Sequence, residues 1–216
     1  MWSSIIVICT IHLFSISLGP KWLFYISKPL PILLMATSLY LAGISDASFH
    51  AMNNSFGLWV LVGLLLSAMG DAFLMHPKDK FVAGLSCFLF AHIAYSIGFF
   101  QTIESITWWI PAGFLAVGVL VFLLLLPNLG AMIIPVALYI VVIVAMTASA
   151  AEFWVAYRSS AGLLALVGAL MFMMSDLVLA IDRFRSASHF SRHVVMVTYY
   201  TAQGLITLSV LASLTA

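Results

Sequence analysis

The sequence is poor in charged residues. Only 7% of its 216 residues are Asp, Glu, Lys or Arg, whereas soluble domains carry about 25%. Hydrophobic residues make up 64% of the chain. We therefore expect an all-α integral membrane protein with one polytopic domain over residues 1–216 and no soluble domain. The net charge of +1 excludes a basic surface for nucleic acid.

Cysteine is also scarce. The two cysteines, Cys9 and Cys87, both lie in apolar runs, so neither a disulfide framework nor a zinc motif is indicated. The first apolar segment, Trp2 to Leu18, has no basic residues before it and no small-residue cleavage site. This pattern indicates a retained membrane span rather than a cleaved signal peptide.

The apolar runs predict a bundle of eight transmembrane helices, because about 20 apolar residues are needed to cross a bilayer. The expected helices are 2–19, 26–44, 56–75, 81–100, 108–127, 130–151, 160–182 and 193–213. A tight turn at Pro127-Asn128 separates the fifth from the sixth, and without it the count would be seven.

The basic residues predict the orientation. Seven of the eight fall in or just inside the odd-numbered connections, and only Arg158 lies at the other face. The seven are Lys21, Lys28, Lys78, Lys80, Arg183, Arg185 and Arg192. The positive-inside rule makes these connections cytoplasmic and both termini non-cytoplasmic. The acids Asp46, Glu104 and Glu152 lie at the opposite face.

Two acids lie within predicted membrane helices. Asp71 and Asp176 are each a few residues from the expected cytoplasmic end, at a depth of roughly 7–10 Å. A carboxylate in this position costs several kcal/mol and usually marks a functional site. The two helices run in the same direction, so their acids could share a cavity open to the cytosolic side, although the sequence does not show that the helices touch.

A weak repeat relates the two acids. Gly70-Asp71 and Ser175-Asp176 are 105 residues apart, as are Tyr95 and Tyr200. We therefore consider a parallel repeat of four helices, related by an axis along the membrane normal.

Other polar residues are candidates for a site near the acids. The last helix places His193, Tyr200, Gln203 and Thr207 on one face. The further candidates are Lys28, His92, Tyr95, Tyr139, Asp182 and Arg183. Basic residues at the rim would suit a phosphate, and apolar walls below would suit an acyl or alkenyl chain. Taken singly, Tyr139, Tyr200 and Gln203 equally suit hydrogen bonds between helices, and His92 equally suits a core position.

Two local pairings have simpler interpretations. Asp182 is suited to capping or to an ion pair with Arg185, three residues later on the helix. His189 and His193 have the i, i+4 spacing of metal ligands, but no third ligand accompanies them, so no metal site is predicted.

Several short segments, in order, resemble the YhhN-like lysoplasmalogenase family, which includes transmembrane protein 86. They are Lys28-Pro29-Leu30-Pro31, Met69-Gly70-Asp71-Ala72-Phe73-Leu74-Met75, Gly84 through His92 and Tyr95, Tyr139, Ser175-Asp176, Leu179-Ala180-Ile181-Asp182-Arg183-Phe184 and Tyr199-Tyr200-Thr201-Ala202-Gln203. The resemblance covers nearly the whole chain. It implies an enzyme with eight helices that hydrolyses the vinyl ether of 1-alkenyl lysophospholipids, giving a fatty aldehyde and glycerophosphoethanolamine or glycerophosphocholine.

The two acids suit this reaction. Protonation of the vinyl carbon gives an oxocarbenium-like cation that water captures, much as glycosidases use two carboxyl groups. We predict that Asp71 and Asp176 are the acid and the base or electrostatic stabiliser, with a preference for Asp176 as the acid. Tyr139, Tyr200 and Gln203 would orient the ether oxygen or the water, and Lys28 and Arg183 would hold the phosphate. No cofactor is required.

Two other functions remain open. A proton-coupled transporter of small molecules or lipids would also use buried acids, and Pro135 is the candidate for the helix break that such proteins favour. An intramembrane aspartyl protease would need Tyr-Asp and Gly-x-Gly-Asp motifs, which the residues before Asp71 and Asp176 do not match. The expected compartment is the endoplasmic reticulum for a eukaryotic protein and the inner membrane for a bacterial one, and Leu214-Thr215-Ala216 carries no retrieval signal.

Overall fold

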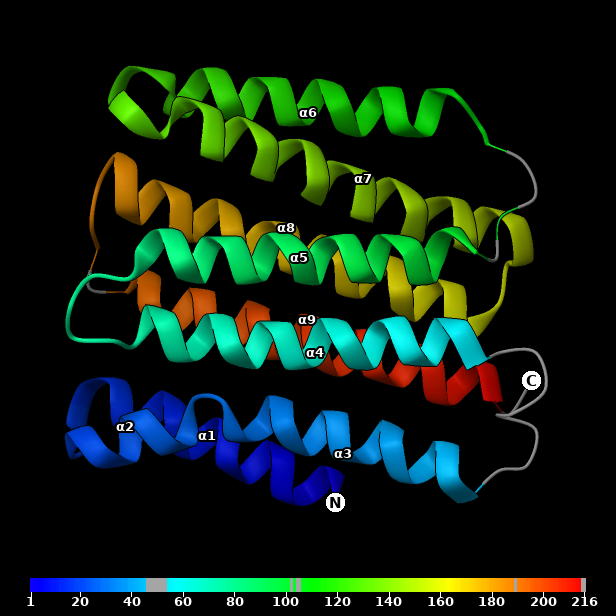
Figure 1. Ribbon diagram of the computed structural model, residues 1–216, viewed down its shortest axis with the longest axis horizontal. Coiled ribbons are helices and arrows are strands. Elements are labelled where there is room, and N and C mark those ends of the chain that lie inside the picture. Colours follow the sequence, from blue (N-terminus) through cyan, green and yellow to red (C-terminus); the bar gives the residue numbers. More distant parts are fainter. Residues whose placement is uncertain (46–53, 102, 104–105, 189, 215–216) are drawn as a thin grey trace.

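The computed structural model describes residues 1–45, 54–101, 103, 106–188 and 190–214, and the secondary structure of this part is entirely helical. The acids Asp46 and Glu104, placed at the non-cytoplasmic face, lie outside the described residues, as does His189. The helices are α1 (Trp2–Leu18), α2 (Lys21–Ser27), α3 (Leu30–Ser45), α4 (Asn54–Leu74), α5 (Phe81–Phe100), α6 (Trp109–Leu125), α7 (Ile133–Tyr157), α8 (Ser160–Phe184) and α9 (Ser191–Leu214). Figure 1 shows them as one elongated bundle of side-by-side helices.

Seven helical stretches in the described part are long and apolar enough to cross a membrane, and α1 is a shorter apolar helix of 17 residues. Each of the eight predicted segments therefore corresponds to a helical unit. The predicted break at Pro127-Asn128 is confirmed, since two short 3₁₀ turns, Leu126–Asn128 and Gly130–Met132, separate α6 from α7. Pro135 lies in the first turn of α7, where the missing N–H has no helical partner to lose, so it does not break a span.

The second predicted helix differs from the structure. It begins at Lys21 rather than near residue 26, as the separate helix α2. Pro29 has no backbone N–H to continue the hydrogen bonds of α2, so α2 ends at Ser27 and α3 begins at Leu30, although Lys28 keeps helical backbone angles. The carbonyl of Lys28 is freed by this break and accepts a 3.0 Å hydrogen bond from the Tyr200 hydroxyl.

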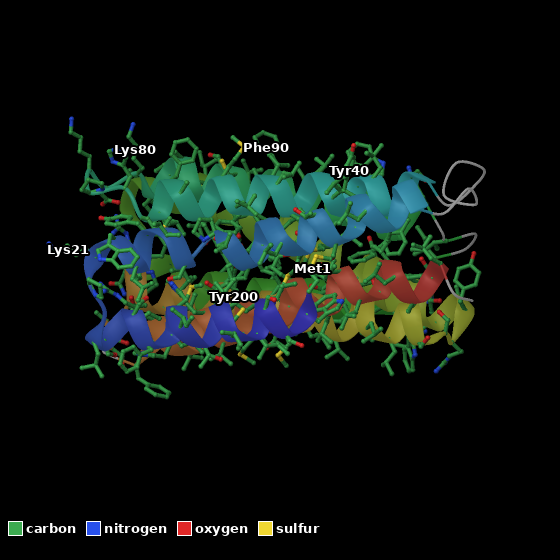
Figure 2. The ribbon with its side chains drawn as sticks, turned by 90° about the horizontal axis from the view of Figure 1, so that it is seen from below. Met1, Lys21, Tyr40, Lys80, Phe90 and Tyr200 are labelled. Atoms are coloured by element: carbon green, nitrogen blue, oxygen red, sulfur yellow. The ribbon has the colours of Figure 1, made fainter. Side chains whose placement is uncertain are left out.

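The helices pair in a regular pattern. The most extensive packing joins α4 to α5 and α8 to α9, and between the two halves of the chain α5 packs on α7 while α9 packs on α3. Two four-helix repeats would produce this arrangement. In such repeats α5 and α9 would occupy equivalent positions, and so would α3 and α7. The connections α1–α2, α4–α5, α6–α7 and α8–α9 gather at one end of the bundle, on the left in Figure 1. Lys21 and Lys80 lie at this end in Figure 2.

Close packing between α4 and α5 depends on glycine. A Cβ atom added at Gly63 would lie 2.2 Å from the Tyr95 ring, and one at Gly70 would lie 2.7 Å from the Phe88 ring. These positions bring the two helices close enough to bury Tyr95 completely. Large apolar side chains such as Tyr40 and Phe90 are instead exposed and point outward, as a lipid-facing surface requires (Figure 2).

Candidate active site

Asp71 and Asp176 line the same cavity, which has a volume of about 500 Å³ and lies toward the end of the bundle that carries the α4–α5 and α8–α9 connections. Asp71 comes from α4 and Asp176 from α8. Further walls come from α1, α2, α5 and α9, and the lining includes Lys28, Arg183 and Arg192. The fold thus gathers acids and bases from distant parts of the chain around one space.

Asp71 is paired with a cation. Its Oδ1 atom lies 3.3 Å from the Lys28 ammonium nitrogen, and its Oδ2 atom accepts a 2.9 Å hydrogen bond from the Tyr199 hydroxyl. Lys28 lies at the junction of α2 and α3, and its backbone angles there are helical. The Asp71 side chain is only 2% exposed, so the ammonium and the phenol supply the contacts that a buried carboxylate needs.

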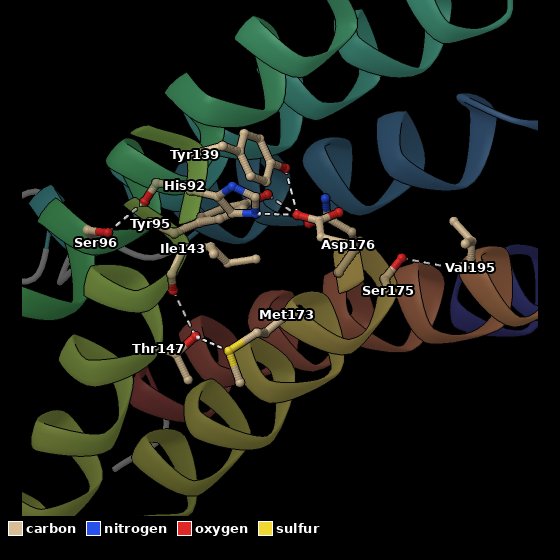
Figure 3. A network of polar contacts seen from close by, with 11 residues as sticks. His92, Tyr95, Ser96, Tyr139, Ile143, Thr147, Met173, Ser175, Asp176 and Val195 are labelled. Carbon is tan, nitrogen blue, oxygen red and sulfur yellow. Dashed lines mark hydrogen bonds and ion pairs between the residues drawn. The ribbon is translucent and has the colours of Figure 1, made fainter. Parts of the chain in front are cut away.

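Asp176 has different partners. The Tyr139 hydroxyl donates a 2.6 Å hydrogen bond to its Oδ2 atom (Figure 3). His92 Nε2 lies 3.6 Å from the same oxygen, which is within ion-pair range but too long for a hydrogen bond, and neither ring nitrogen of His92 has a hydrogen-bond partner. No Lys or Arg of the described chain forms an ion pair with Asp176. The Asp176 side chain is 13% exposed, whereas that of Asp71 is 2% exposed. Asp176 is therefore the more accessible of the two acids.

Ser175 fixes the position of Asp176 between helices. Its hydroxyl donates a 3.0 Å hydrogen bond to the Val195 carbonyl of α9 (Figure 3). This contact ties α8 to α9 next to the acid. The ring of His92 packs edge-on against Phe172 and Tyr139, at 4.5 Å and 5.3 Å between ring centroids. Helices α5, α7, α8 and α9 therefore all determine where the carboxyl group of Asp176 lies.

A second, almost wholly apolar cavity of about 320 Å³ shares the lining residues Phe81, Asp176 and Leu179 with the first, and Asp176 is the polar one among them. It lies among α5, α6, α7 and α8, and its walls include Val117, Val121, Val136, Ile140 and Leu177. Tyr139 also lines it, whereas Lys28, Arg183 and Arg192 line only the polar cavity. Asp176 thus stands between a space lined by charged groups and a space lined by hydrocarbon.

The rim of the polar cavity carries an exposed ion pair. Arg183 Nη2 lies 2.6 Å from Asp79 Oδ2, and the guanidinium group lies 4.6 Å from the centre of the Phe81 ring. Asp79 belongs to the α4–α5 connection, so this pair joins that connection to the end of α8. The hydrogen bond from Arg183 holds the pKa of Asp79 below its ordinary value.

Asp182 caps the start of α9 instead of pairing with Arg185. It accepts hydrogen bonds from the Ser188 backbone N–H, at 3.0 Å, and from the Ser191 hydroxyl. Arg185 donates to the Leu124 carbonyl at 3.2 Å. Of the two roles considered for Asp182, the pair with Arg185 does not form, because the chain turns after Phe184, which carries Arg185 toward α6 and leaves Asp182 facing the connection to α9.

Four predicted site residues, His92, Tyr95, Tyr200 and Gln203, line neither cavity. Tyr200 turns to the Lys28 carbonyl, and the Tyr95 hydroxyl donates a 2.7 Å hydrogen bond to Gln203 Oε1. All four are buried, which agrees with the alternative interpretation of Tyr200 and Gln203 as groups that bond between helices and of His92 as a core residue. His193 contacts Ser17 at 3.1 Å, and Glu152 accepts a 2.7 Å hydrogen bond from the Thr107 N–H near the opposite end.

The sequence interpretation missed three residues of the polar cavity. They are Asp79, Arg192 and Tyr199. Arg192 and Tyr199 are seven residues apart on α9, so they share one helical face. That spacing was a signal in the sequence, but the neighbouring face with Tyr200 and Gln203 has more polar residues. Asp79 gave no comparable signal, because a charged residue in a connection is ordinarily solvated.

The chain matches the YhhN family over residues 23–210. It belongs to the YhhN family. This YhhN-family chain is 34% identical to a protein named lysoplasmalogenase TMEM86A from Bos taurus, over 91% of the chain and 82% of the relative. It is 35% identical to the human protein named lysoplasmalogenase TMEM86B, over 89% and 77%. It is 26% identical to the Escherichia coli O157:H7 membrane protein YhhN, over 87% of each. No solved structure matches it.

Among the described residues of this YhhN-family protein, no group of three or more His, Cys, Asp and Glu side chains is placed to hold a metal ion. The polar groups that the fold does bring together are two acids, two phenols, an imidazole and several cations. Such a set can transfer protons, stabilise a positive charge and bind an anion.

Proposed function

We propose that this protein is a lysoplasmalogenase, which hydrolyses the vinyl ether bond of 1-alkenyl lysophospholipids to a fatty aldehyde and a glycerophospho alcohol. The observation that carries the proposal is the position of Asp176 between the polar and the apolar cavity. A lysoplasmalogen has the same division, with an alkenyl chain on one side of the ether and a charged headgroup on the other. The names of the relatives from Bos taurus and human support the same activity.

In the proposed complex the alkenyl chain lies in the apolar cavity and the phosphate lies among the cations of the polar cavity. This places the vinyl ether at Asp176. The orientation predicted from the positive-inside rule opens the polar cavity to the cytosol. A lysophospholipid could then enter from the cytosolic leaflet with its headgroup in water.

Asp176 is the proposed proton donor, because its partners are a phenol and an imidazole rather than a cation. It transfers a proton to the vinyl carbon remote from oxygen, which leaves an oxocarbenium-like cation at the carbon bonded to oxygen. Asp71, with its ammonium partner, serves as the carboxylate of the pair and stabilises this cation.

Water then adds to the cationic carbon and returns one proton to Asp176, giving a hemiacetal. The carbon–oxygen bond to glycerol breaks as the hemiacetal collapses, and the hydroxyl proton is passed to the departing oxygen. The products are the aldehyde and the glycerophospho alcohol. His92 lines neither cavity, and its Nε2 atom lies 3.6 Å from Asp176 Oδ2, so in this mechanism it acts on the acid rather than on the water.

The test is aldehyde release from a 1-alkenyl lysophospholipid by the purified protein in detergent, with Asp71→Asn and Asp176→Asn alongside. The matched substrate control has a saturated 1-alkyl ether, which cannot be protonated at carbon. We expect aldehyde from the wild type only, with both variants keeping the helical content and elution volume of the wild type. Aldehyde from folded Asp176→Asn at the wild-type rate would remove the proposed acid.

If the folded wild type releases no aldehyde, the proposed lysoplasmalogenase activity is rejected and the alternative of a proton-coupled transporter is favoured. Micelles hold no gradient, so product formation in detergent cannot arise from transport.

A further inference from the structure

We propose that Arg192, Arg183 and Asp79 form a site for a zwitterionic headgroup, in which the two arginines bind the phosphate and Asp79 binds a primary amine. The inference rests on the proposed function and specifies its substrate as the ethanolamine lysophospholipid. We call these three residues the headgroup site. All three line the polar cavity, and none lines the apolar one.

The charges of the cavity lining point first to Arg192. Of its three cations, Lys28 is paired with Asp71 and Arg183 with Asp79. Within the described chain, Arg192 alone among these three has no carboxylate within ion-pair distance. Of the two remaining acids of the lining, Asp182 is occupied by the backbone of Ser188 and the hydroxyl of Ser191, and Asp176 accepts a hydrogen bond from Tyr139. A phosphate can therefore bind Arg192 without breaking an existing ion pair.

The pair between Arg183 and Asp79 can open at little cost. Its side chains are 44% and 65% exposed, and exposed ion pairs contribute little stability because water solvates each charge on its own. A phosphate that takes over the guanidinium of Arg183 frees the Asp79 carboxylate nearby. A headgroup that carries both a phosphate and an ammonium replaces both halves of the pair, so no charge is left without a partner.

The lining favours a primary amine over a quaternary one. A primary ammonium donates hydrogen bonds to a carboxylate, whereas a trimethylammonium group has no N–H and is held by aromatic faces. The Phe81 ring, which lines the polar cavity beside Arg183, already has the guanidinium of Arg183 over one face. Asp79 is thus suited to ethanolamine and gives choline nothing comparable. A phosphate without an amine would displace Asp79 from Arg183 and leave the carboxylate unpaired.

The test compares aldehyde release from three 1-alkenyl lysophospholipids that differ only in the headgroup, namely ethanolamine, choline and unsubstituted phosphate. We expect the wild type to prefer ethanolamine. In Asp79→Asn the kcat/KM for ethanolamine should fall about tenfold, as expected for the loss of one hydrogen bond to a charged group, while that for the unsubstituted phosphate stays the same or rises because Arg183 is free. A merely structural role for Asp79 would lower both together.

Arg192→Gln should raise KM about tenfold for all three headgroups with little change in kcat. Lys21→Gln is the matched control, since it removes one positive charge at the same end of the bundle from an exposed residue that lines neither cavity. An unchanged headgroup ratio in Asp79→Asn, or a KM in Arg192→Gln equal to that of Lys21→Gln, would overturn the inference.

A binding measurement separates this inference from the enzymatic proposal. Glycerophosphoethanolamine should raise the Tm of the detergent-solubilised wild type in a concentration-dependent way, glycerophosphate should raise it less, and Asp79→Asn should abolish the difference. If no substrate releases aldehyde, the lysoplasmalogenase activity is rejected and these Tm shifts alone decide on the headgroup site. Equal shifts with both compounds, or none, would reject that site as well.

Discussion

Tyr139 of α7 donates a 2.6 Å hydrogen bond to Asp176 of α8, at the point where the polar and apolar cavities meet. The phenol thereby fixes the rotamer of the acid and leaves its other carboxyl oxygen, Oδ1, for a substrate. Asp71 has its own phenol, Tyr199, together with the ammonium of Lys28. The two acids thus share a cavity but have unequal surroundings, as a proton donor and a stabilising carboxylate require.

Removing the Tyr139 hydroxyl should impair catalysis more than binding. We expect Tyr139→Phe to lower kcat for aldehyde release about tenfold to a hundredfold, because a hydrogen bond to a charged or reacting group contributes about 1.5–3 kcal/mol. KM should change little. Tyr40→Phe is the control, since Tyr40 is exposed at the outer surface. A Tyr139→Phe enzyme with wild-type kcat would show that the phenol does not position the acid.

The pair between Lys28 and Asp71 should be essential for stability as well as for catalysis. Lys28→Met leaves a buried carboxylate without its cation, which costs about 3–5 kcal/mol in comparable buried pairs. We expect a clear loss of Tm in detergent and partial recovery in Lys28→Met/Asp71→Asn, although this double variant should remain inactive. A single variant as stable as the wild type would mean that water or another group replaces the ammonium.

The apolar cavity should set the preferred length of the alkenyl chain. Val121→Trp fills space that the chain would occupy, so we expect KM to rise more for long chains than for short ones. Val119→Trp adds the same side chain to α6, at a residue that is 48% exposed and lines neither cavity. The measurement is KM over a series of alkenyl chain lengths for both variants. If KM depends on chain length in the same way in both, the alkenyl chain does not lie in the apolar cavity.

The close approach of α4 and α5 should not tolerate a side chain at Gly63. Gly63→Ala places a Cβ atom 2.2 Å from the Tyr95 ring, and overpacking of this kind costs about 1–3 kcal/mol. Gly113→Ala is the matched control in α6, since nothing lies within 4 Å of the added atom. We expect a lower Tm for the first and an unchanged or higher Tm for the second. Equal Tm values would show that Tyr95 shifts freely.

The contact between Asp79 and Arg183 should be insensitive to pH near neutrality. Arg183 lowers the pKa of Asp79 from its ordinary value of 3.8. An acid whose folded-state pKa is depressed contributes its stability above the ordinary pKa and loses it as the pH falls through the lower value. In a double-mutant cycle of Asp79→Asn and Arg183→Gln followed by Tm, any coupling at pH 7 should persist to about pH 5 and vanish only below about pH 4. Loss of coupling between pH 7 and pH 5 would contradict this assignment.

The positions of the eight apolar segments could be predicted because hydropathy is a local property. Each apolar run must satisfy its backbone hydrogen bonds within the membrane, so its length alone indicates a helix. The same reasoning failed at Lys28-Pro29, where the helix starts at Lys21 and is interrupted. A proline within a basic, half-apolar stretch is compatible with a helix start or a helix break, and the folded chain has the break, next to the Lys28 carbonyl that accepts a hydrogen bond from Tyr200.

Hydropathy and sequence position are enough to place Asp71 and Asp176 within apolar helices near one end of the bundle, because they set the depth of each residue. The partners of the two acids depend on how the helices pack. Successive residues of a helix differ by about 100° in direction, so the rotation of α9 places Tyr199 against Asp71 and turns Tyr200 away. Likewise, Arg192 and Asp79 enter the cavity because α9 and the α4–α5 connection pack where they do. Contacts between segments a hundred residues apart follow from packing of the whole bundle, which no local pattern specifies.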